Sequence, residues 1–134
     1  MNLEYSIHEL SKIAKVSTRT LRYYHEINLL YPKRTNSSGY RIYGEKEVDK
    51  LQQILFYKSL GFKLEDIKNI INSPSFDIMT ALNNHKKELI KRRKEIDLLI
   101  ENVEKTISYK KGEINMSDKE KFEAFKKHLI NRLC

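Results

Sequence analysis

Several features that define common protein classes are missing from this 134-residue sequence. Its single cysteine is Cys134, so neither an intramolecular disulfide nor a cysteine-rich zinc site is expected. Four glycines and two prolines exclude the usual glycine-rich phosphate-binding enzymes and collagen-like or linker-like chains. No apolar run approaches the roughly 20 residues that cross a bilayer, and the N-terminal stretch lacks the pattern of a secretory signal. A cytoplasmic protein without a membrane partner is therefore expected.

Catalytic constellations are missing as well. The sequence offers no nucleophile–base pair, no metal-ligand spacing and no phosphate-binding loop. Four histidines lie far apart along the chain: His8, His25, His85 and His128. Because they form no metal-binding spacing, we interpret them as surface or packing residues. We therefore expect a protein that is not an enzyme and that needs no cofactor and no metal.

Positive charge is what the sequence has in excess, and it is concentrated in one segment. The 26 Lys and Arg residues outnumber the 18 Asp and Glu residues, which gives a formal net charge of +8. Residues 12–41 contain seven of the cations and one acid, and tyrosines alternate with the arginines there. Arginine provides forked donors for phosphates and base edges, and tyrosine adds a phenolic donor. This mixture favours a grooved polyanion such as double-stranded DNA over a membrane surface.

The basic segment also predicts two short helices. Ser6 and Glu9 form a capping-box pattern at the start of a helix over 6–14. A tight break follows, and Ser17 is a good N-cap for a second helix over 18–26. Two short helices joined by so few residues predict a helix-turn-helix, whose second helix enters the major groove of DNA. That helix presents four side chains away from its apolar face: Thr18, Arg19, Arg22 and Tyr23.

A hairpin and two further helices are predicted next. Polar residues, Gly39 and the β-type run 40–43 predict a short antiparallel hairpin, or wing, over 31–43. Apolar residues at helical spacing predict amphipathic helices over about 45–60 and 64–71.

A long rod is predicted from Asp77 to Tyr109, where nothing breaks a helix. At a rise of 1.5 Å per residue its length is roughly 50 Å. Apolar side chains recur along it as a coiled-coil seam: Leu82, Leu89, Ile96, Leu99, Ile100, Val103 and Ile107. A single helix cannot bury such a seam, so a second copy of the chain is the simplest partner. The first half of the seam is more polar, at His85 or Lys86 and at Arg92 or Arg93, so tighter pairing is expected in the second half.

A final helix is predicted over 118–132, after a break at Lys111 and Gly112. Ser117 and Glu120 form another capping-box pattern. The apolar stripe of this helix consists of Phe122, Phe125, Leu129 and Leu133. So short a helix is marginal alone, so it either docks on the dimer or belongs to a segment absent from this chain. We interpret its phenylalanines as packing residues rather than as a ligand site.

One set of residues carries a family resemblance: Tyr5-Ser6-Ile7, Ile13-Ala14, Val16-Ser17, Arg19-Thr20-Leu21-Arg22-Tyr23-Tyr24, Ile27, Leu29-Leu30, Pro32, Arg34, Gly39-Tyr40-Arg41, Tyr43, and Leu60-Gly61-Phe62 with Leu64 and Ile67. In these motifs the chain resembles the MerR family of bacterial transcription regulators. The tail from Met116 to Phe125 resembles the opening of the drug-binding domain of TipA-type members. Three positions depart from the family pattern: Lys15 and Asn28 stand where glycine is common, and His25 stands where aspartate is usual.

The resemblance implies a mainly α fold in three parts. A winged helix-turn-helix DNA-binding domain is expected over 1–75 and a long antiparallel coiled-coil dimerisation helix over 76–111. Residues 112–134 are expected to form a tail helix, the start of a truncated effector-domain-like segment. The implied function is a homodimeric regulator on a palindromic promoter, which distorts the spacer DNA and so acts on RNA polymerase indirectly. Whether a small-molecule effector exists is left open, and the rival interpretation is a protein-interaction module with an incidental basic region.

The resemblance also assigns roles to single residues. Thr18, Arg19 and Arg22 are expected at the major groove, where the sequence does not say which of them reach bases. Tyr23 and Tyr24 are expected at the DNA backbone, with Tyr24 alternatively half core. The wing residues expected to grip phosphates are Lys33, Arg34, Tyr40 and Arg41. Tyr43 is expected either to contact DNA or to pack beneath the wing.

Overall fold

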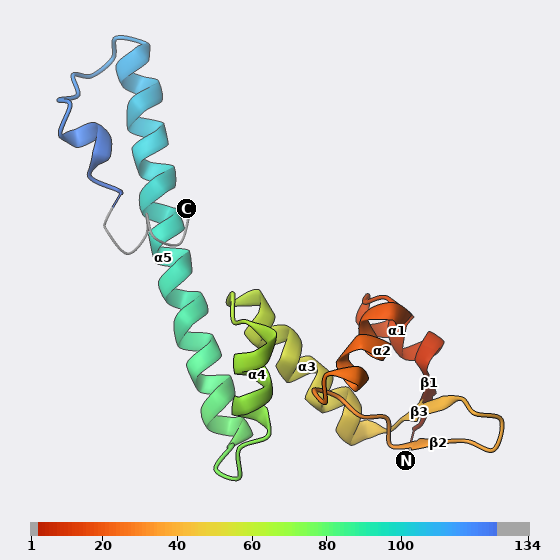
Figure 1. Cartoon of the computed structure of the whole chain (residues 1–134). Helices are drawn as coiled ribbons and strands as arrows, with labels where there is room; N and C mark the ends of the chain where they lie inside the picture. Colours follow the sequence, from red (N-terminus) through yellow and green to blue (C-terminus); the bar gives the residue numbers. More distant parts are fainter. Residues whose placement is uncertain (1–2, 126–134) are drawn as a thin grey trace. The chain divides into compact units, whose positions relative to one another are not determined.

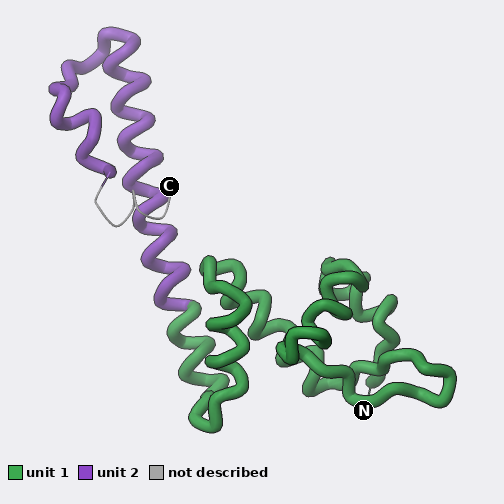
Figure 2. Tube along the Cα trace, in the orientation of Figure 1, with its two compact units in different colours: residues 1–85 green, residues 86–134 purple. Residues whose placement is uncertain are grey.

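The computed structural model describes residues 3–125 (Figure 1). The chain divides into two compact units, residues 1–85 and residues 86–134 (Figure 2). The first unit contains the small sheet and the shorter helices, and the second contains most of the long helix with the tail that follows it. Within residues 3–125, no helix is both long enough and apolar enough to cross a membrane.

The first helix, α1 (Ile7–Ala14), begins and ends as the sequence predicts. The Ser6 hydroxyl accepts a hydrogen bond from the Glu9 N–H at 3.1 Å, and the Ser6 N–H donates to the Glu9 carboxylate at 2.9 Å. These two bonds lower the pKa of Glu9 and satisfy amides that the first turn leaves free. Lys15 ends the helix in the left-handed conformation, with φ of 57°. The turn is therefore tight enough to start a second helix three residues later.

That second helix, α2 (Thr18–Glu26), is the predicted recognition helix. The Ser17 hydroxyl caps it by accepting a hydrogen bond from the Thr20 N–H at 3.0 Å. Beyond its end, Asn28 adopts a left-handed conformation with φ of 62°. The predicted helix-turn-helix and both of its N-caps are thus confirmed.

The predicted hairpin is confirmed, and it gains a third strand that the sequence analysis missed. Strand β2 (Arg34–Thr35) pairs antiparallel with β3 (Arg41–Tyr43), and β3 also pairs with β1 (Tyr5–Ser6). The Asn36 side chain closes the turn by accepting hydrogen bonds from the Tyr40 and Ser38 amides at 2.9 and 3.0 Å. Helix α1 follows directly after β1 in the chain, and β1 pairs with β3 of the hairpin. This pairing ties the hairpin to the helix-turn-helix.

Three more helices follow: α3 (Glu45–Ser59), α4 (Leu64–Ile71) and α5 (Ile78–Lys110). The core of the first unit is built from the five helices, strand β3 and the segment after α2: Ile7, Leu10, Leu21, Tyr24, Leu29, Leu30, Tyr43, Leu51, Ile54, Tyr57, Ile67 and Ala81. Because the inward faces of α2 and β3 share this core, their outward faces are held in fixed relation to each other.

In the second unit the tail lies against α5. The chain turns at Gly112 and buries Met116, whose sulfur lies 3.8 Å from the Thr106 hydroxyl. Asn102 donates a side-chain hydrogen bond to the Glu120 carbonyl at 3.1 Å. The Lys121 ammonium lies 4.9 Å from the centre of the Tyr109 ring.

The prediction of a tail helix over 118–132 is wrong in the part that the structure describes. The Ser117–Glu120 capping box forms, but only the short 3-10 helix η1 (Glu120–Phe122) follows it. Instead of the predicted stripe, Met116 and Ala124 are buried, whereas Phe122 is 67% exposed. The residues that the described tail buries are therefore not those of the predicted stripe. Residues 126–132, with Leu129, and Leu133 beyond them lie outside the described residues.

Candidate nucleic-acid interface

The outward face of α2 carries the side chains that the sequence singled out. Arg19, Arg22 and Tyr23 are exposed, and Thr18 is half-buried. Arg22 Nη1 donates to the Thr18 hydroxyl at 3.3 Å, a bond between residues one helical turn apart. Thr18 and Arg22 therefore share one stripe of the helix, and Arg19 and Tyr23 form the stripe beside it.

Two tyrosines for which the sequence allowed either a DNA contact or a core position are core residues. Tyr24 is 1% exposed and Tyr43 is fully buried, which corrects the expectation for Tyr24 and decides the open alternative for Tyr43 in favour of packing beneath the wing. Tyr24 lies three residues after the buried Leu21, on the same face of α2. Burial raises the pKa of Tyr43, although the charges of Arg41 and Arg22 lower it. Both hydroxyls are buried without a hydrogen-bond partner among the described residues.

The two cations at the start of the hairpin are paired with an acid from β1's flank. Lys33 Nζ lies 3.0 Å from one carboxylate oxygen of Glu4, and Arg34 Nη2 lies 2.6 Å from the other. The hydrogen bonds from Lys33 and then Arg34 lower the pKa of Glu4. Part of the positive charge predicted to grip phosphates is thus neutralised within the protein. Glu4 carries no signal of this role in the sequence, because only the pairing of β1 with β3 brings it to the hairpin.

Arg41, on β3, is held by the recognition helix. Its Nε donates to His25 Nδ1 at 3.1 Å, and the His25 ring lies edge-on to Tyr31 at a centroid distance of 5.6 Å. Next to it, Tyr40 is 63% exposed at the wing. The candidate interface therefore combines the exposed face of α2 with Tyr40 and Arg41 from the hairpin and Tyr31 from the segment before it. The sequence predicts only a surface or packing role for His25, whereas the structure gives it a specific hydrogen-bond partner.

The apolar side chains of α5 are largely uncovered within the single chain. Leu82 and Leu99 are half-buried. The other five seam residues are 46–57% exposed: Leu89, Ile96, Ile100, Val103 and Ile107. Contiguous exposure of this kind marks an interaction surface.

His85 does not extend this seam. It is 4% exposed, with its ring centre 5.5 Å from that of Phe56 and 4.4 Å from that of Tyr57. Both aromatic residues belong to α3, so His85 is a packing residue of the first unit. Burial lowers its pKa below the ordinary value of 6.5.

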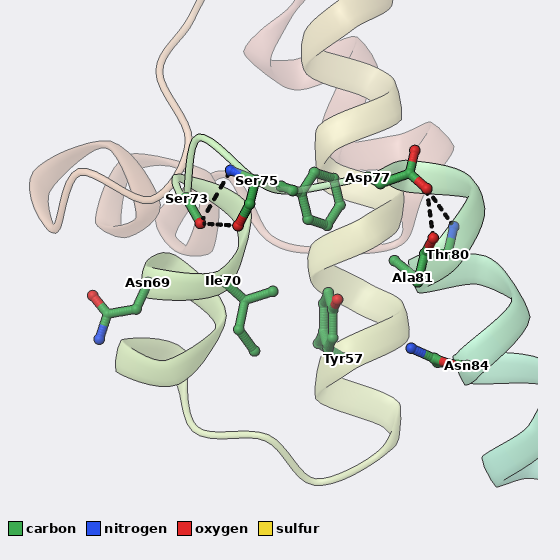
Figure 3. A pocket seen from close by; sticks show the side chains of 10 residues that line it. Tyr57, Asn69, Ile70, Ser73, Ser75, Asp77, Thr80, Ala81 and Asn84 are labelled. Atoms are coloured by element: carbon green, nitrogen blue, oxygen red, sulfur yellow. Dashed lines mark hydrogen bonds between the residues drawn. The ribbon is translucent and has the colours of Figure 1, made fainter.

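The first unit also contains a pocket (Figure 3). It is lined by residues of α3 and α4, the loop after α4 and the start of α5. Asp77 is one of the lining residues, and Figure 3 shows its carboxylate beside Thr80, where it accepts hydrogen bonds from the Thr80 hydroxyl and N–H at 2.5 and 3.1 Å. These bonds lower the pKa of Asp77, which thereby caps α5. No residue of α2 or the hairpin lines the pocket, and residues 3–125 contain no cluster of potential metal ligands.

Fold and exposed side chains together define a class: a winged helix-turn-helix protein with a basic recognition face and a long helix bearing an uncovered apolar seam. Comparisons with known proteins specify the family. The model described as MerR HTH family regulatory protein matches residues 5–73, and the one described as MerR, DNA binding matches residues 48–105. The chain therefore belongs to the MerR family of helix-turn-helix regulators, as its motifs predicted.

Individual relatives agree with this assignment. The chain is 35% identical over 120 residues to the transcriptional activator Mta of Bacillus subtilis, covering 90% of this chain and 47% of that protein. It is 33% identical over 123 residues to the activator TipA of Streptomyces coelicolor, covering 92% and 49%. The chain thus spans about half the length of these curated relatives. The crystal structure of the regulator SkgA from Caulobacter crescentus superposes with a TM-score of 0.88 at 31% identity, covering 98% of this chain and 94% of that one.

Proposed function

We propose that the chain is a homodimeric, sequence-specific DNA-binding regulator of transcription that acts in the cytoplasm and is not an enzyme. The observation that carries this proposal is the exposed face formed by Arg19, Arg22 and Tyr23 on a helix whose other face is fixed in the core. A rigid helix with exposed arginines fits the major groove, and forked guanidinium donors fit base edges and phosphates. Tyr40 and Arg41 of the wing extend the contact along the DNA backbone.

The proposed division of labour follows the chain. Residues 1–75 bind DNA, residues 76–111 dimerise, and residues 112–134 form a tail segment. Two copies of α5 pair antiparallel through the exposed seam, which buries the apolar surface that one chain leaves in water. The second half of the seam, which has the more consistent apolar spacing, contributes most to this pairing.

Dimerisation sets how far apart the two recognition helices stand, and a palindromic promoter supplies two matching half-sites. If half-sites and helices do not match in straight DNA, the protein must bend or untwist the spacer, at a cost on the order of 1–10 kcal/mol. Contacts to the phosphates offset that cost. In this way the dimer alters how the promoter is presented to RNA polymerase, without contacting a cofactor or catalysing a reaction.

The test combines DNA binding with oligomeric state. The probe is the double-stranded intergenic DNA upstream of the chain's own reading frame, titrated by fluorescence anisotropy over a range of salt. We expect nanomolar affinity, a steep salt dependence and a footprint with two-fold symmetry. Binding that is weak and insensitive to salt would favour a protein-interaction module instead.

Sedimentation of seam variants tests the dimer. Ile96→Asp places a charge in the seam and is expected to yield a 16 kDa monomer with much weaker DNA binding. Asn83→Asp introduces the same residue, with the same change of one charge, at an exposed polar position of α5 and serves as the matched control. Equal effects of the two variants would contradict the proposed seam.

A further inference from the structure

The contact between His25 and Arg41 joins the two elements that form the proposed DNA interface. His25 is on α2 and Arg41 is on β3, sixteen residues apart, and Arg41 Nε donates to His25 Nδ1 at 3.1 Å. Both side chains are half-buried, and Tyr31 packs edge-on against the imidazole from the loop between them. The imidazole is therefore held on one side by an aromatic ring while it accepts the guanidinium's hydrogen bond.

The direction of this bond fixes the chemical form of the imidazole. A guanidinium has only donors, so Nδ1 must present its lone pair. His25 is then neutral, with its proton on Nε2. The bond uses one of the five N–H groups of Arg41, and the four on the terminal nitrogens are not used by it.

We infer that His25 is a positioning residue for DNA binding: it orients Arg41 so that the terminal nitrogens reach a backbone phosphate while α2 occupies the groove. This inference rests on the proposed function. An arginine held by its Nε loses less side-chain entropy when it binds, because part of its rotamer freedom is already restricted. A neutral acceptor has a further advantage, since it holds the guanidinium without cancelling its charge. A carboxylate at this position would accept the same hydrogen bond but repel the phosphate.

A double-mutant cycle on the full chain tests the inference, with the upstream intergenic duplex as the probe. We expect Arg41→Ala and His25→Ala each to weaken binding about tenfold. In the Arg41→Ala background, His25→Ala is expected to have no further effect, because its partner is gone. His8→Ala, at an exposed histidine of α1, is the matched control and should leave the affinity unchanged.

Conservative variants separate positioning from packing. Asn places a neutral oxygen near the position of Nδ1, so His25→Asn is expected to keep the affinity within about twofold of wild type. His25→Asp keeps an acceptor but adds negative charge, so its binding is expected to be weaker than that of His25→Asn. Nitrogen-15 NMR of the histidine ring in the free protein should show a neutral imidazole with its proton on Nε2.

The outcomes distinguish this inference from the proposed function. If the wild-type chain does not bind DNA, the proposed function is refuted and the role of His25 with it. If the wild type binds but the losses in the cycle are additive, or if His25→Asn binds no better than His25→Ala, only the role of His25 is refuted. A proton on Nδ1 in the NMR spectrum would likewise overturn it.

Discussion

Glu4 offers the sharpest test of how the protein distributes charge at the interface. Its two carboxylate oxygens pair with Lys33 and Arg34, the cations at the start of the hairpin. While these pairs persist, neither cation is available to release a counterion from DNA. Replacing Glu4 with Gln keeps the size of the side chain, removes its charge and replaces one of the two accepting oxygens with an NH2 group that cannot accept from a cation. Glu4→Gln is therefore expected to bind DNA more tightly at low salt and to depend more steeply on salt.

The size of the change follows from the number of cations involved. The logarithm of the binding constant falls with the logarithm of the salt concentration by about 0.9 for each phosphate neutralised. With Arg19, Arg22 and Arg41 alone, the proposed dimer neutralises six phosphates and the slope is about −5. With the two hairpin cations added in each protomer the number is ten, and the slope approaches about −9.

Fluorescence anisotropy titrations at four or more salt concentrations measure this slope for wild type and Glu4→Gln. Glu113→Gln changes the charge equally at an exposed position in the other compact unit, so it controls for net charge alone. A wild-type slope already near −9 that stays constant in Glu4→Gln would refute the reasoning. In that case Lys33 and Arg34 leave Glu4 when DNA binds.

Three further predictions concern single side chains. Arg22→Ala is expected to weaken binding to all duplexes and to reduce the steepness of the salt slope by about 1 for each phosphate that the arginine neutralises. The same anisotropy titrations measure this slope, and an unchanged slope would show that Arg22 neutralises no phosphate. Tyr43→Phe removes a buried hydroxyl without a partner, so urea unfolding should show equal or higher stability, by up to about 1 kcal/mol, with DNA affinity within about twofold of wild type. Loss of DNA affinity would return Tyr43 to the interface. Because burial lowers the pKa of His85, the unfolded chain binds its proton more readily, so stability is fully present above the ordinary pKa of 6.5 and falls as pH decreases below it. His85→Phe should reduce the difference in urea midpoint between about pH 7.5 and about pH 5.5, and an unchanged difference would assign that dependence to other groups.

Much of the fold was predictable because it depends on local rules. The N-caps at Ser6 and Ser17 and the left-handed turn at Lys15 follow from side chains that satisfy neighbouring amides. The boundaries of the recognition helix depend on these short-range contacts, and the structure places them where the sequence predicts. Apolar spacing likewise predicted the long helix, which extends from Ile78 to Lys110.

The candidate site was less predictable, because a residue's type does not say which way the fold turns it. Tyr23 and Tyr24 are neighbours of identical chemistry, yet one is exposed and the other buried. Tyr24 lies three residues after the buried Leu21, so helical periodicity predicts that Tyr24 is buried too. The chemistry of tyrosine, which suits a contact to DNA, points the other way. For Tyr43 the sequence left two alternatives, and only the packing of β3 against the core chose between them.

The sequence by itself determined the class of this protein: capping patterns, apolar periodicity and a concentrated positive charge are local properties that fix helices and their exposed chemistry. The tertiary structure decided which charges are free and which are held. Glu4 meets Lys33 and Arg34, and His25 meets Arg41, only because strand pairing brings segments far apart in the chain within hydrogen-bond distance. Such contacts leave no periodic trace in the sequence, since they depend on the register of one strand against another rather than on the spacing along either.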